Sequence, residues 1–316
     1  MTIPAEPGDD RHDRHDPDLS AVTSERRRLV NLAYRMLGSR ADAEDVVQET
    51  YARWYAMSRQ EQDAIDTPGA WLTTVASRVC LTLLGSARVR RERYVGQWVP
   101  EPVPDETEWI SGRRTAVPVD PADRVTLDES LNMAFLVVLE SMTPAERVAF
   151  ILHDVFRYPF PEVAEIVGRT PAACRQLATS ARRRVRAART PAAAPPARMA
   201  GVVRDFKAAW EAKDIDALLG LLDPDATVTP DGGGVTGARL HPIEGAEEIA
   251  RYLVELAGRA VGGMGFVLRT VNGQPGLVAQ RDGVTVAVYA FDVAGDRIRH
   301  MWAVLNPDKL RAWSVG

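Results

Sequence analysis

The sequence predicts a multi-domain protein in which two all-helical units precede an α+β domain with a curved antiparallel sheet. Apolar residues recur at three- and four-residue spacing over residues 25–93 and again over 122–188. After residue 198, strand-like runs alternate with turns such as Asn272-Gly273 and Asp282-Gly283. Prolines interrupt both helical stretches. The expected boundaries are a tail at 1–20, domains at 21–97, 122–189 and 198–316, and linkers at 98–121 and 190–197.

Length and composition exclude several classes of protein. A chain of 316 residues corresponds to roughly two or three domains of about 150 residues. The longest apolar run, Met133–Leu139, is far shorter than the roughly 20 residues that a membrane helix needs. The first twenty residues are rich in aspartate and lack an apolar segment, so we expect a disordered tail, no secretory signal and a cytoplasmic location.

Histidine and cysteine usage predicts no metal site. Cys80 and Cys174 form no C-x-x-C pair, which argues against a disulfide scaffold or a cysteine-based metal site. His12 and His15 lie in the expected tail, where no neighbouring ligands hold them. Cys174 is interpreted as a small buried side chain.

The distribution of charge is more informative than the net charge of -4. Residues 26–197 carry more basic than acidic side chains, whereas both flanking parts are acidic. Arginines concentrate at 78–93 and again at 171–197. Two local basic segments predict contacts with a polyanion, although a solvated basic face explains either segment taken alone.

The first helical unit contains an acidic cluster and an arginine-rich helix. Its second helix begins with closely spaced acidic residues, which the helix dipole favours and which an acidic docking surface explains equally well. Thr67 and Pro68 predict the start of the third helix. Trp71 and the arginines that follow suit stacking on unpaired bases and contact with phosphates, whereas Trp71 alone is better explained as a core residue.

Residues 160–186 predict a helix-turn-helix. A short apolar helix meets Gly168-Arg169-Thr170, after which Thr170 caps and Pro171 opens a second helix. Arg175, Thr179, Arg182 and Arg186 then project within about 60 degrees of one another. This basic face suits phosphate contact, and the flanking Gln176 and Arg183 suit base edges in a major groove. A cationic, solvated helix of an ordinary bundle is the alternative.

The last domain has helices expected at 199–213, 215–222 and 246–258 and strands at 265–271, 276–280, 284–293 and 297–305. Its catalytic candidates are Asp225, Asp231, His241 and His300, but the sequence brings no two of them together. Positions in turns explain Asp225 and Asp231, and His300 is explained as a structural histidine within a strand. An apolar pocket that binds a small-molecule ligand is a further possibility for this domain. Residues 232–237 fit G-x-G-x-x-G, but no helix follows, so no dinucleotide site is expected.

Three ordered motifs resemble the extracytoplasmic-function (group IV) RNA polymerase sigma factors. The segment DAEDVVQETYARWY resembles the core-binding helix of region 2, and TPGAWLTTVASRV with ARVRRERYVG resembles the helix that melts and reads the minus-ten element. The segment MTPAERVAFILHDVFRYPFPEVAEIVGRTPAACRQLATSARRRVR resembles region 4, which reads the minus-thirty-five element. Leu81-Thr82-Leu83-Leu84-Gly85-Ser86 departs from the L-D-x-L-R-S of many relatives.

The resemblance implies roles for individual residues. Those facing the polymerase would be Asp42, Glu44, Asp45, Gln48 and Glu49. Those near the minus-ten strand would be Trp71, Arg78, Arg88, Arg90, Arg91 and Arg93. Those at the minus-thirty-five duplex would be Arg175, Gln176, Thr179, Arg182, Arg183 and Arg186.

Further motifs resemble the sigma-J-like class, which carries a C-terminal SnoaL-like domain of the NTF2 superfamily. The linker segment QWVPEP resembles W-L-P-E-P, DGGG occurs at 231–234 and NPDKL at 306–310, while Val235 stands where relatives often have lysine. The regulatory contacts implied are Trp98, Pro100, Glu101, Pro102, Asp231, Gly232, Gly233, Gly234, Asn306, Pro307, Asp308, Lys309 and Leu310. We predict that segment 306–310 packs near the 98–102 linker. The resemblance implies that the fused domain regulates the sigma module in place of a separate anti-sigma partner.

The resemblance implies a sigma factor, not an enzyme, that binds core RNA polymerase through its clamp and flap regions and directs initiation at promoter DNA without a cofactor. One rival interpretation is a helix-turn-helix regulator that senses a ligand and acts without polymerase. A second is a SnoaL-like enzyme with a DNA-binding appendage. On the sigma factor interpretation, Arg182→Ala is expected to weaken promoter binding. The slope of the logarithm of the binding constant against the logarithm of salt concentration should fall in magnitude by about one.

Overall fold

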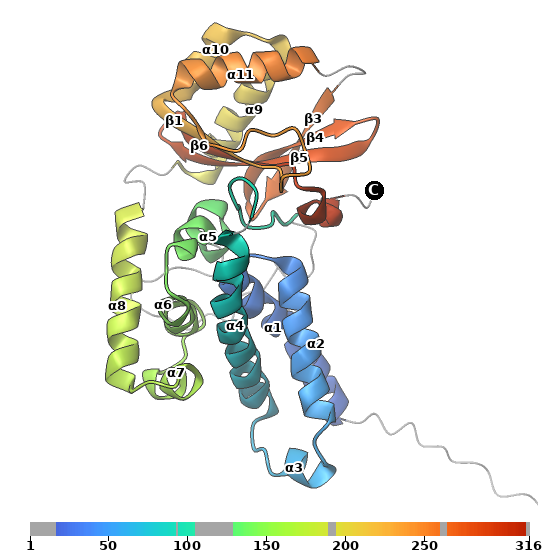
Figure 1. The fold of residues 1–316 in the computed structure, drawn as a ribbon, viewed down its shortest axis with the longest axis vertical. Helices are drawn as coiled ribbons and strands as arrows, with labels where there is room; N and C mark the ends of the chain where they lie inside the picture. Colours follow the sequence, from blue (N-terminus) through green and yellow to red (C-terminus); the bar gives the residue numbers. More distant parts are fainter. Residues whose placement is uncertain (1–16, 93, 105–128, 189–193, 260–263, 314–316) are drawn as a thin grey trace, which may run out of the picture.

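A computed structural model of the chain describes residues 17–92, 94–104, 129–188, 194–259 and 264–313. The helices of the first two units form one body, and the C-terminal domain lies on one end of that body (Figure 1). Among the described residues, no helix has both the length and the apolar character that a membrane span needs.

Four helices form the first unit: α1 (Pro17–Leu37), α2 (Arg40–Tyr55), α3 (Arg59–Asp63) and α4 (Pro68–Glu92). Helix α1 begins inside the segment expected to be a tail, of which residues 1–16 lie outside the described residues. Gly38, with φ of 67°, follows the last residue of α1, and the Ser39 side chain then caps α2 by accepting from the Asp42 amide at 3.2 Å.

The second unit contains η1 (Glu129–Leu131), α5 (Met133–Glu140), α6 (Pro144–Phe150), η2 (Ile151–Val155), α7 (Phe160–Val167) and α8 (Pro171–Ala188). The predicted helix-turn-helix is formed by α7 and α8. Gly168 ends α7 in the left-handed conformation, and the Thr170 hydroxyl accepts from the Ala173 amide at 3.2 Å. The π-helical turn η2 had no signal in the sequence.

The two helical units share one hydrophobic core, although the sequence predicted separate domains. Residues of α1, α2 and α4 belong to the same buried cluster as residues of α5 to α8. The buried Arg147 of α6 donates to the Met36 carbonyl at 3.0 Å and to the Glu140 carboxylate at 2.9 Å. Burial lowers the pKa of Arg147 to about 9. The units therefore pack as one body in this structure.

The C-terminal domain contains α9 (Pro196–Ala212), α10 (Ile215–Leu221) and α11 (Ala246–Arg259) around a six-stranded sheet. The strands are β1 (Leu222–Asp231), β2 (Ile243–Glu244), β3 (Met264–Val271), β4 (Gln274–Arg281), β5 (Val284–Ala294) and β6 (Arg297–Val304). Their order is β2-β1-β6-β5-β4-β3. Two short helices follow β6, η3 (Pro307–Lys309) and η4 (Arg311–Trp313).

The sheet is mixed, because β1 pairs with β6 in parallel while the other pairs are antiparallel. Strands β3 to β6 occupy the predicted runs, joined by the predicted turns. Strand β1 was missed, since Pro224 and Pro230 argue against a strand. The register shift between Leu222 and Thr227 accommodates Pro224 within the ladder.

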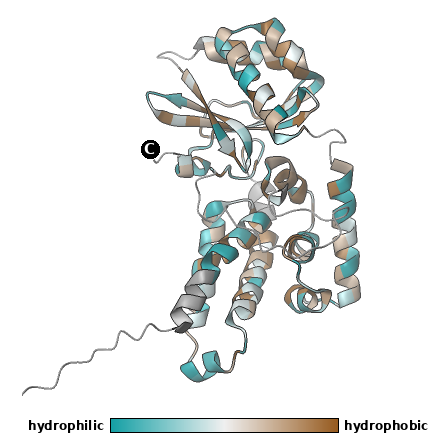
Figure 2. Ribbon diagram, turned by 180° about the vertical axis from the view of Figure 1, so that it is seen from behind, coloured by the Kyte–Doolittle hydropathy of each residue, from teal (hydrophilic) through white to brown (hydrophobic). Residues whose placement is uncertain are grey.

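The two faces of the sheet pack against different partners. The inner face packs on the helices of its own domain, through an aromatic cluster formed by Phe206, Trp210, Phe266, Tyr289 and Phe291. The outer face, which carries Val288, Trp302 and Val304, packs on Val99 of the linker and on Met133 of α5. Helix α5 is hydrophobic around most of its circumference (Figure 2), as expected of a helix buried on several sides.

Candidate nucleic-acid interface and regulatory contacts

The predicted polymerase-facing residues lie on α2. Ala43, Val46 and Val47 face the core, so Asp45, Gln48 and Glu49 are left exposed on the other side of the helix. Asp42 lies in the first turn, where the helix dipole favours it. Glu44 and Glu49 form ion pairs one turn apart, with Arg40 and Arg53. Pairs this exposed are weak. The acidic face of α2 is therefore open to a partner.

The predicted minus-ten residues that the structure describes do not form an open arginine face. Arg78 donates to the Glu165 carbonyl of α7 at 3.0 Å and so ties α4 to the helix-turn-helix. The half-buried Trp71 ring packs edge-to-face on Trp54, with centroids 5.3 Å apart, as the core explanation of this residue predicts. The side chains of Arg88, Arg90 and Arg91 at the end of α4, and all of Arg93, lie outside the described residues.

The predicted minus-thirty-five residues lie along α8. Cys174, Ala178 and Ala181 form its buried stripe. Gln176 and Arg183 lie opposite this stripe by helical geometry, and both are exposed. Thr179 and Arg186 are also exposed, as is Arg175, whose guanidinium lies over the Phe160 ring at 5.2 Å. The surface most open to a groove is therefore centred on Gln176 and Arg183, which the sequence placed at its flank.

Arg182 is engaged by a carboxylate of its own chain. Its guanidinium donates twice to Asp154 of η2, at 2.6 and 3.3 Å, and the Asp154 side chain is 5% exposed. The sequence places Arg182 on the same helical face as Arg175, but it does not reveal that η2 brings a carboxylate there. Removing this arginine leaves a buried carboxylate unpaired, so Arg182→Ala changes folding as well as binding.

The linker segment 98–104 is held first by the helical body. The Glu101 amide donates to the Gly38 carbonyl at 2.8 Å, and the Tyr34 hydroxyl donates to the Glu101 carbonyl at 2.6 Å. The Glu101 carboxylate accepts from the Arg40 amide at 2.7 Å, at the start of α2. Burial raises the pKa of Glu101, and the amide hydrogen bonds oppose that shift. The linker thus provides an acidic cap for the helix with the acidic face.

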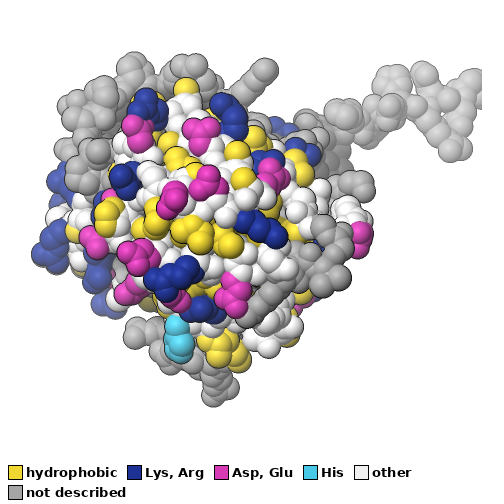
Figure 3. Space-filling model, turned by 90° about the horizontal axis from the view of Figure 1, so that it is seen from above, with side chains coloured by type: hydrophobic (Ala, Val, Ile, Leu, Met, Phe, Trp, Pro, Cys, Tyr) yellow, Lys and Arg dark blue, Asp and Glu magenta, His cyan; other side chains and the backbone are white. Residues whose placement is uncertain are grey.

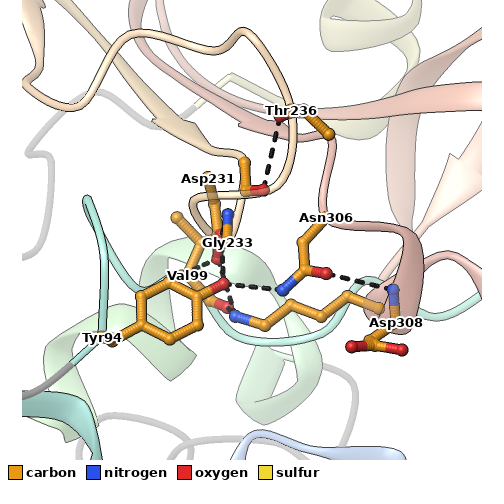
Figure 4. A network of polar contacts seen from close by, with 9 residues as sticks. Tyr94, Val99, Asp231, Gly233, Thr236, Asn306 and Asp308 are labelled. Carbon is orange, nitrogen blue, oxygen red and sulfur yellow. Dashed lines mark hydrogen bonds and ion pairs between the residues drawn. The ribbon is translucent and has the colours of Figure 1, made fainter.

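The same segment is held on its other side by the C-terminal domain (Figure 4). The fully buried Asp231 accepts from the Val99 amide at 2.9 Å, from the Tyr94 hydroxyl at 2.5 Å and from the Lys309 ammonium at 2.6 Å. Lys309 also donates to the Val99 carbonyl at 2.5 Å and lies 4.2 Å from the centre of the Trp98 ring. The predicted packing of segment 306–310 near the linker is therefore observed.

The other predicted regulatory residues surround this network. Asn306 donates to the Tyr94 hydroxyl at 2.7 Å, and its side chain also accepts from the Asp308 amide at 3.0 Å. Pro307 opens η3 and Leu310 is buried in the interface cluster. Pro102 accepts from the Trp313 indole at 2.9 Å. Pro100 packs near Gly38. Val235 is 73% exposed, so the absence of a lysine at this position leaves this network intact.

The glycines of segment 231–234 allow this close approach. Gly233 and Gly234 have φ of 62° and 72°, a conformation that other residues adopt at a cost. A Cβ atom at Gly233 would lie 2.5 Å from the Asn306 amide nitrogen, and one at Gly234 would lie 2.7 Å from Val95. Both positions therefore need glycine for conformation and for space.

Gly233→Ala is expected to lower the free energy of unfolding by about 2 kcal/mol, because the methyl group displaces Asn306 and the backbone is strained. Urea unfolding of the full chain measures this loss. Gly283→Ala, at φ of 78° and with no neighbouring atom within 4 Å of the added Cβ, is the matched control. Equal stabilities for the two variants would contradict the packing argument.

Two residues in this region, Asn272 and Tyr94, had no signal in the sequence for their roles here. The buried Asn272 side chain accepts from the Val103 amide at 3.1 Å and donates to the Tyr34 hydroxyl at 2.8 Å and to the Leu131 carbonyl at 3.1 Å. It thereby joins the linker to both helical units, whereas the sequence explained it as a turn residue. Tyr94 lies between the arginine-rich segment and the linker, without a feature that distinguishes it from other tyrosines.

The candidate catalytic residues do not form a site. Asp231 lies on the outer face of the sheet, where it contacts the linker. His300 stacks on Trp302 of the same face, away from the aromatic interior. His300 also contacts the Thr229 hydroxyl at 2.9 Å. Asp225 and His241 are exposed. Asp231 is engaged with the linker, so turn geometry alone does not explain it.

The stability of the chain is expected to fall as the pH drops from about 6.5 to about 4. Burial lowers the pKa of His300 from 6.5 to about 4, so the unfolded chain binds this proton more readily than the folded chain. The loss is about 3 kcal/mol. Urea unfolding across this range measures it, with His300→Gln as the variant that does not titrate. If His300→Gln showed the same fall in stability, other groups would be responsible.

The helical face of the C-terminal domain differs from α8 in charge. Seen from above, acidic and basic side chains are interspersed around hydrophobic ones (Figure 3). Arg239 pairs with Glu248 and Arg251 pairs with Glu247 on this surface. A surface of mixed sign offers little attraction to a polyanion, so the basic face of α8 is the better nucleic-acid surface.

Comparisons with known proteins agree with this arrangement. Family models match residues 21–90 (Sigma-70 region 2), 132–185 (Sigma-70, region 4) and 203–305 (SnoaL-like domain). The ECF RNA polymerase sigma factor SigJ of Mycobacterium tuberculosis is 37% identical over 310 residues, covering 92% of this chain and 93% of that protein. The probable ECF sigma factor SigI of the same species is 35% identical over 302 residues, covering 95% and 98%.

A solved structure extends the similarity to the whole architecture. The crystal structure of Mycobacterium tuberculosis SigJ aligns with a TM-score of 0.71 and 33% identity, covering 93% of this chain and 98% of that one. At this coverage the alignment spans both helical units and the C-terminal domain. This chain belongs to the extracytoplasmic-function (ECF) RNA polymerase sigma factors and carries a C-terminal SnoaL-like domain.

Proposed function

We propose that this protein binds core RNA polymerase through α2 and directs promoter-specific initiation through α4 and α8. The observation that carries the proposal is that one chain exposes both an acidic face on α2 and a basic face on α8. A helix-turn-helix regulator that works without polymerase has no use for the α2 face. The relatives named above are RNA polymerase sigma factors, which supports the same function in the cytoplasm, where promoter DNA and polymerase meet.

The observed packing corresponds, on this proposal, to a form that is not yet engaged with a promoter. Elements near minus ten and minus thirty-five are separated by about 25 base pairs, or roughly 85 Å of duplex. Helices α4 and α8 contain 25 and 18 residues, which is about 37 and 27 Å, and Arg78 ties α4 directly to α7. The two helical units therefore have to separate before both elements are read.

The C-terminal domain controls this separation, on the same proposal, by holding the linker. Segment 98–104 is bonded to Gly38 and Tyr34 on one side and to Asp231, Asn272 and Lys309 on the other. Moving either helical unit away requires some of these contacts to break. The aromatic cluster fills the inner face of the sheet, so regulation through the linker is better supported than regulation by a ligand in that interior.

Asp45→Lys is expected to weaken binding to core polymerase by about tenfold or more, because it puts a like charge against a basic partner. Pull-down of the full chain with purified core polymerase at low ionic strength measures this. Asp66→Lys makes the same charge change at an exposed residue outside α2, and should bind normally. Undiminished binding of Asp45→Lys, or equal loss in both variants, would reject α2 as the polymerase-facing helix.

A further inference from the structure

The first turn of α2 is capped from two sides. The amides of Arg40, Ala41 and Asp42 precede the first intrahelical hydrogen bond, so they have no backbone partner within the helix. The Ser39 hydroxyl accepts from one of them, the Asp42 amide. The Glu101 carboxylate of the linker accepts from the other two, and lies 2.7 Å from the Arg40 amide. The linker therefore completes a cap that the helix and its N-cap residue leave unfinished.

Glu101 is fixed in this position by its own backbone. Its amide donates to the Gly38 carbonyl at 2.8 Å, and its carbonyl accepts from the buried Tyr34 hydroxyl at 2.6 Å. Glu101 is only 6% exposed. A carboxylate this buried is stable only where donors replace the lost water, so the amides of α2 are a condition of its burial.

The capped turn carries two of the residues expected to face polymerase. Asp42 lies in the first turn, and Glu44 is paired with Arg40 at 2.9 Å. Glu101 holds the Arg40 amide, so the cap also places this ion pair. If the turn frays, both carboxylates take many orientations, and a partner orders them at a cost in affinity. The buried Glu101 therefore acts on polymerase through α2 and not by direct contact.

The linker is held by the helical body more firmly than by the C-terminal domain. The Val103 side chain is fully buried in the helical core, and a Cβ atom at Gly38 would lie 3.0 Å from the Trp98 ring. On the other side, Asp231 and Lys309 both belong to the C-terminal domain, so they remain paired when the linker leaves. Release from the C-terminal domain therefore leaves no unpaired charge, whereas release from the helical body uncaps α2.

We propose that Glu101 is a positioning residue for polymerase binding: it orders the first turn of α2, and segment 98–104 stays on the helical body when polymerase binds. The inference rests on the proposed function, because it takes α2 to be the polymerase-facing helix. The coupling acts in both directions. A linker that favours the polymerase-binding form of α2 is itself anchored more firmly once polymerase is bound.

Glu101→Ala should weaken binding of the full chain to purified core polymerase about fivefold, the factor that corresponds to the loss of a helix cap. Glu101→Gln keeps an oxygen that accepts from the Arg40 amide, and should recover most of this loss. Trp313→Phe is the matched control, because it deletes the indole donor to the Pro102 carbonyl and so loosens the same segment from the C-terminal domain. Its affinity for polymerase should equal that of the unmodified chain.

Hydrogen exchange gives a readout that a purely structural role of Glu101 would not change. Polymerase should slow exchange at the Glu101 amide about fivefold, by the reciprocity of coupling. The slowing should be smaller at the Val99 and Val103 amides, whose partners belong to the C-terminal domain. The proposal is overturned if Glu101→Ala binds polymerase as tightly as the unmodified chain, or if exchange at the Glu101 amide is not slowed in the complex.

The free chain separates this inference from the proposed function. Without polymerase, Glu101→Ala should speed exchange at the Arg40 and Ala41 amides, whereas Trp313→Phe should not. If these amides are unchanged in Glu101→Ala, Glu101 is not the cap, and the inference fails even though polymerase binds. If the unmodified chain does not bind polymerase, the proposed function fails, and the positioning role fails with it even where the cap is confirmed.

Discussion

Lys309→Met is expected to lower the free energy of unfolding by about 3–5 kcal/mol, because it leaves a buried carboxylate without its cationic partner. Asp231 is fully buried, and the Lys309 ammonium lies 2.6 Å from it. The same ammonium holds the Val99 carbonyl of the linker, so the linker should also loosen. Urea unfolding measures the first effect, and hydrogen exchange at the Val99 and Glu101 amides measures the second.

A double variant separates the charge from the packing. Asp231→Asn combined with Lys309→Met removes both charges and keeps similar shapes, so it should recover much of the stability lost in Lys309→Met. The introduced asparagine would still accept from the Val99 amide, which now lies 2.9 Å from the Asp231 carboxylate. A double variant as unstable as Lys309→Met, with unchanged exchange at Val99, would show that the ion pair does not hold the linker.

Asn272→Gly is expected to lower the free energy of unfolding by about 3 kcal/mol, since three buried hydrogen bonds lose a partner. Asn272 has φ of 51°, which glycine adopts readily, so the substitution removes the side chain without straining the turn. The lost contacts join Val103, Tyr34 and Leu131. Unfolding should also become less cooperative, because this amide couples the C-terminal domain to the helical body.

The neighbouring hairpin supplies a matched control. Asp282 occupies the equivalent position in the β4–β5 turn, with φ of 52° and an exposed side chain. Asp282→Gly makes the same backbone change and should alter the stability by less than about 0.5 kcal/mol. Similar losses in the two variants would mean that the turn conformation, and not the buried amide of Asn272, matters.

The sequence predicted the elements whose signals are local. Gly168 and Thr170 predict the turn of the helix-turn-helix. The structure confirms that α7 ends at Gly168 and that Thr170 caps the start of α8. Asn-Gly and Asp-Gly turns define the hairpins of β3 to β5, which are confirmed as well. Such signals act within a few residues, so one sequence suffices to recognise them.

Contacts between distant segments could not be predicted from the sequence. Strand β1 is stabilised by pairing with β6, which overrides the preference of Pro224 and Pro230 for turns. Arg78 and Arg182 belong to basic segments but are engaged by Glu165 and Asp154. Helical periodicity gives the side of a helix on which a residue lies, but not which partner covers that side.

The roles of the linker and of segments 231–234 and 306–310 were expected from the resemblance and not from any local pattern. Their geometry explains why those residues occur there: Asp231 needs a buried cation, and Gly233 needs space for Asn306. Asn272 completes the same interface, although its Asn-Gly turn accounts for it locally. When local structure already explains a residue, as the Asn-Gly turn explains Asn272, the sequence gives no sign that the residue also has a role in tertiary packing.

The most direct test of the central claim is reconstituted transcription with purified core polymerase and genomic promoter fragments. We predict transcripts with defined start sites only when this protein is added, lost in Asp45→Lys and retained in Asp66→Lys. If core polymerase neither binds the protein at low ionic strength nor starts specific transcripts in its presence, the sigma factor function proposed for this chain is contradicted.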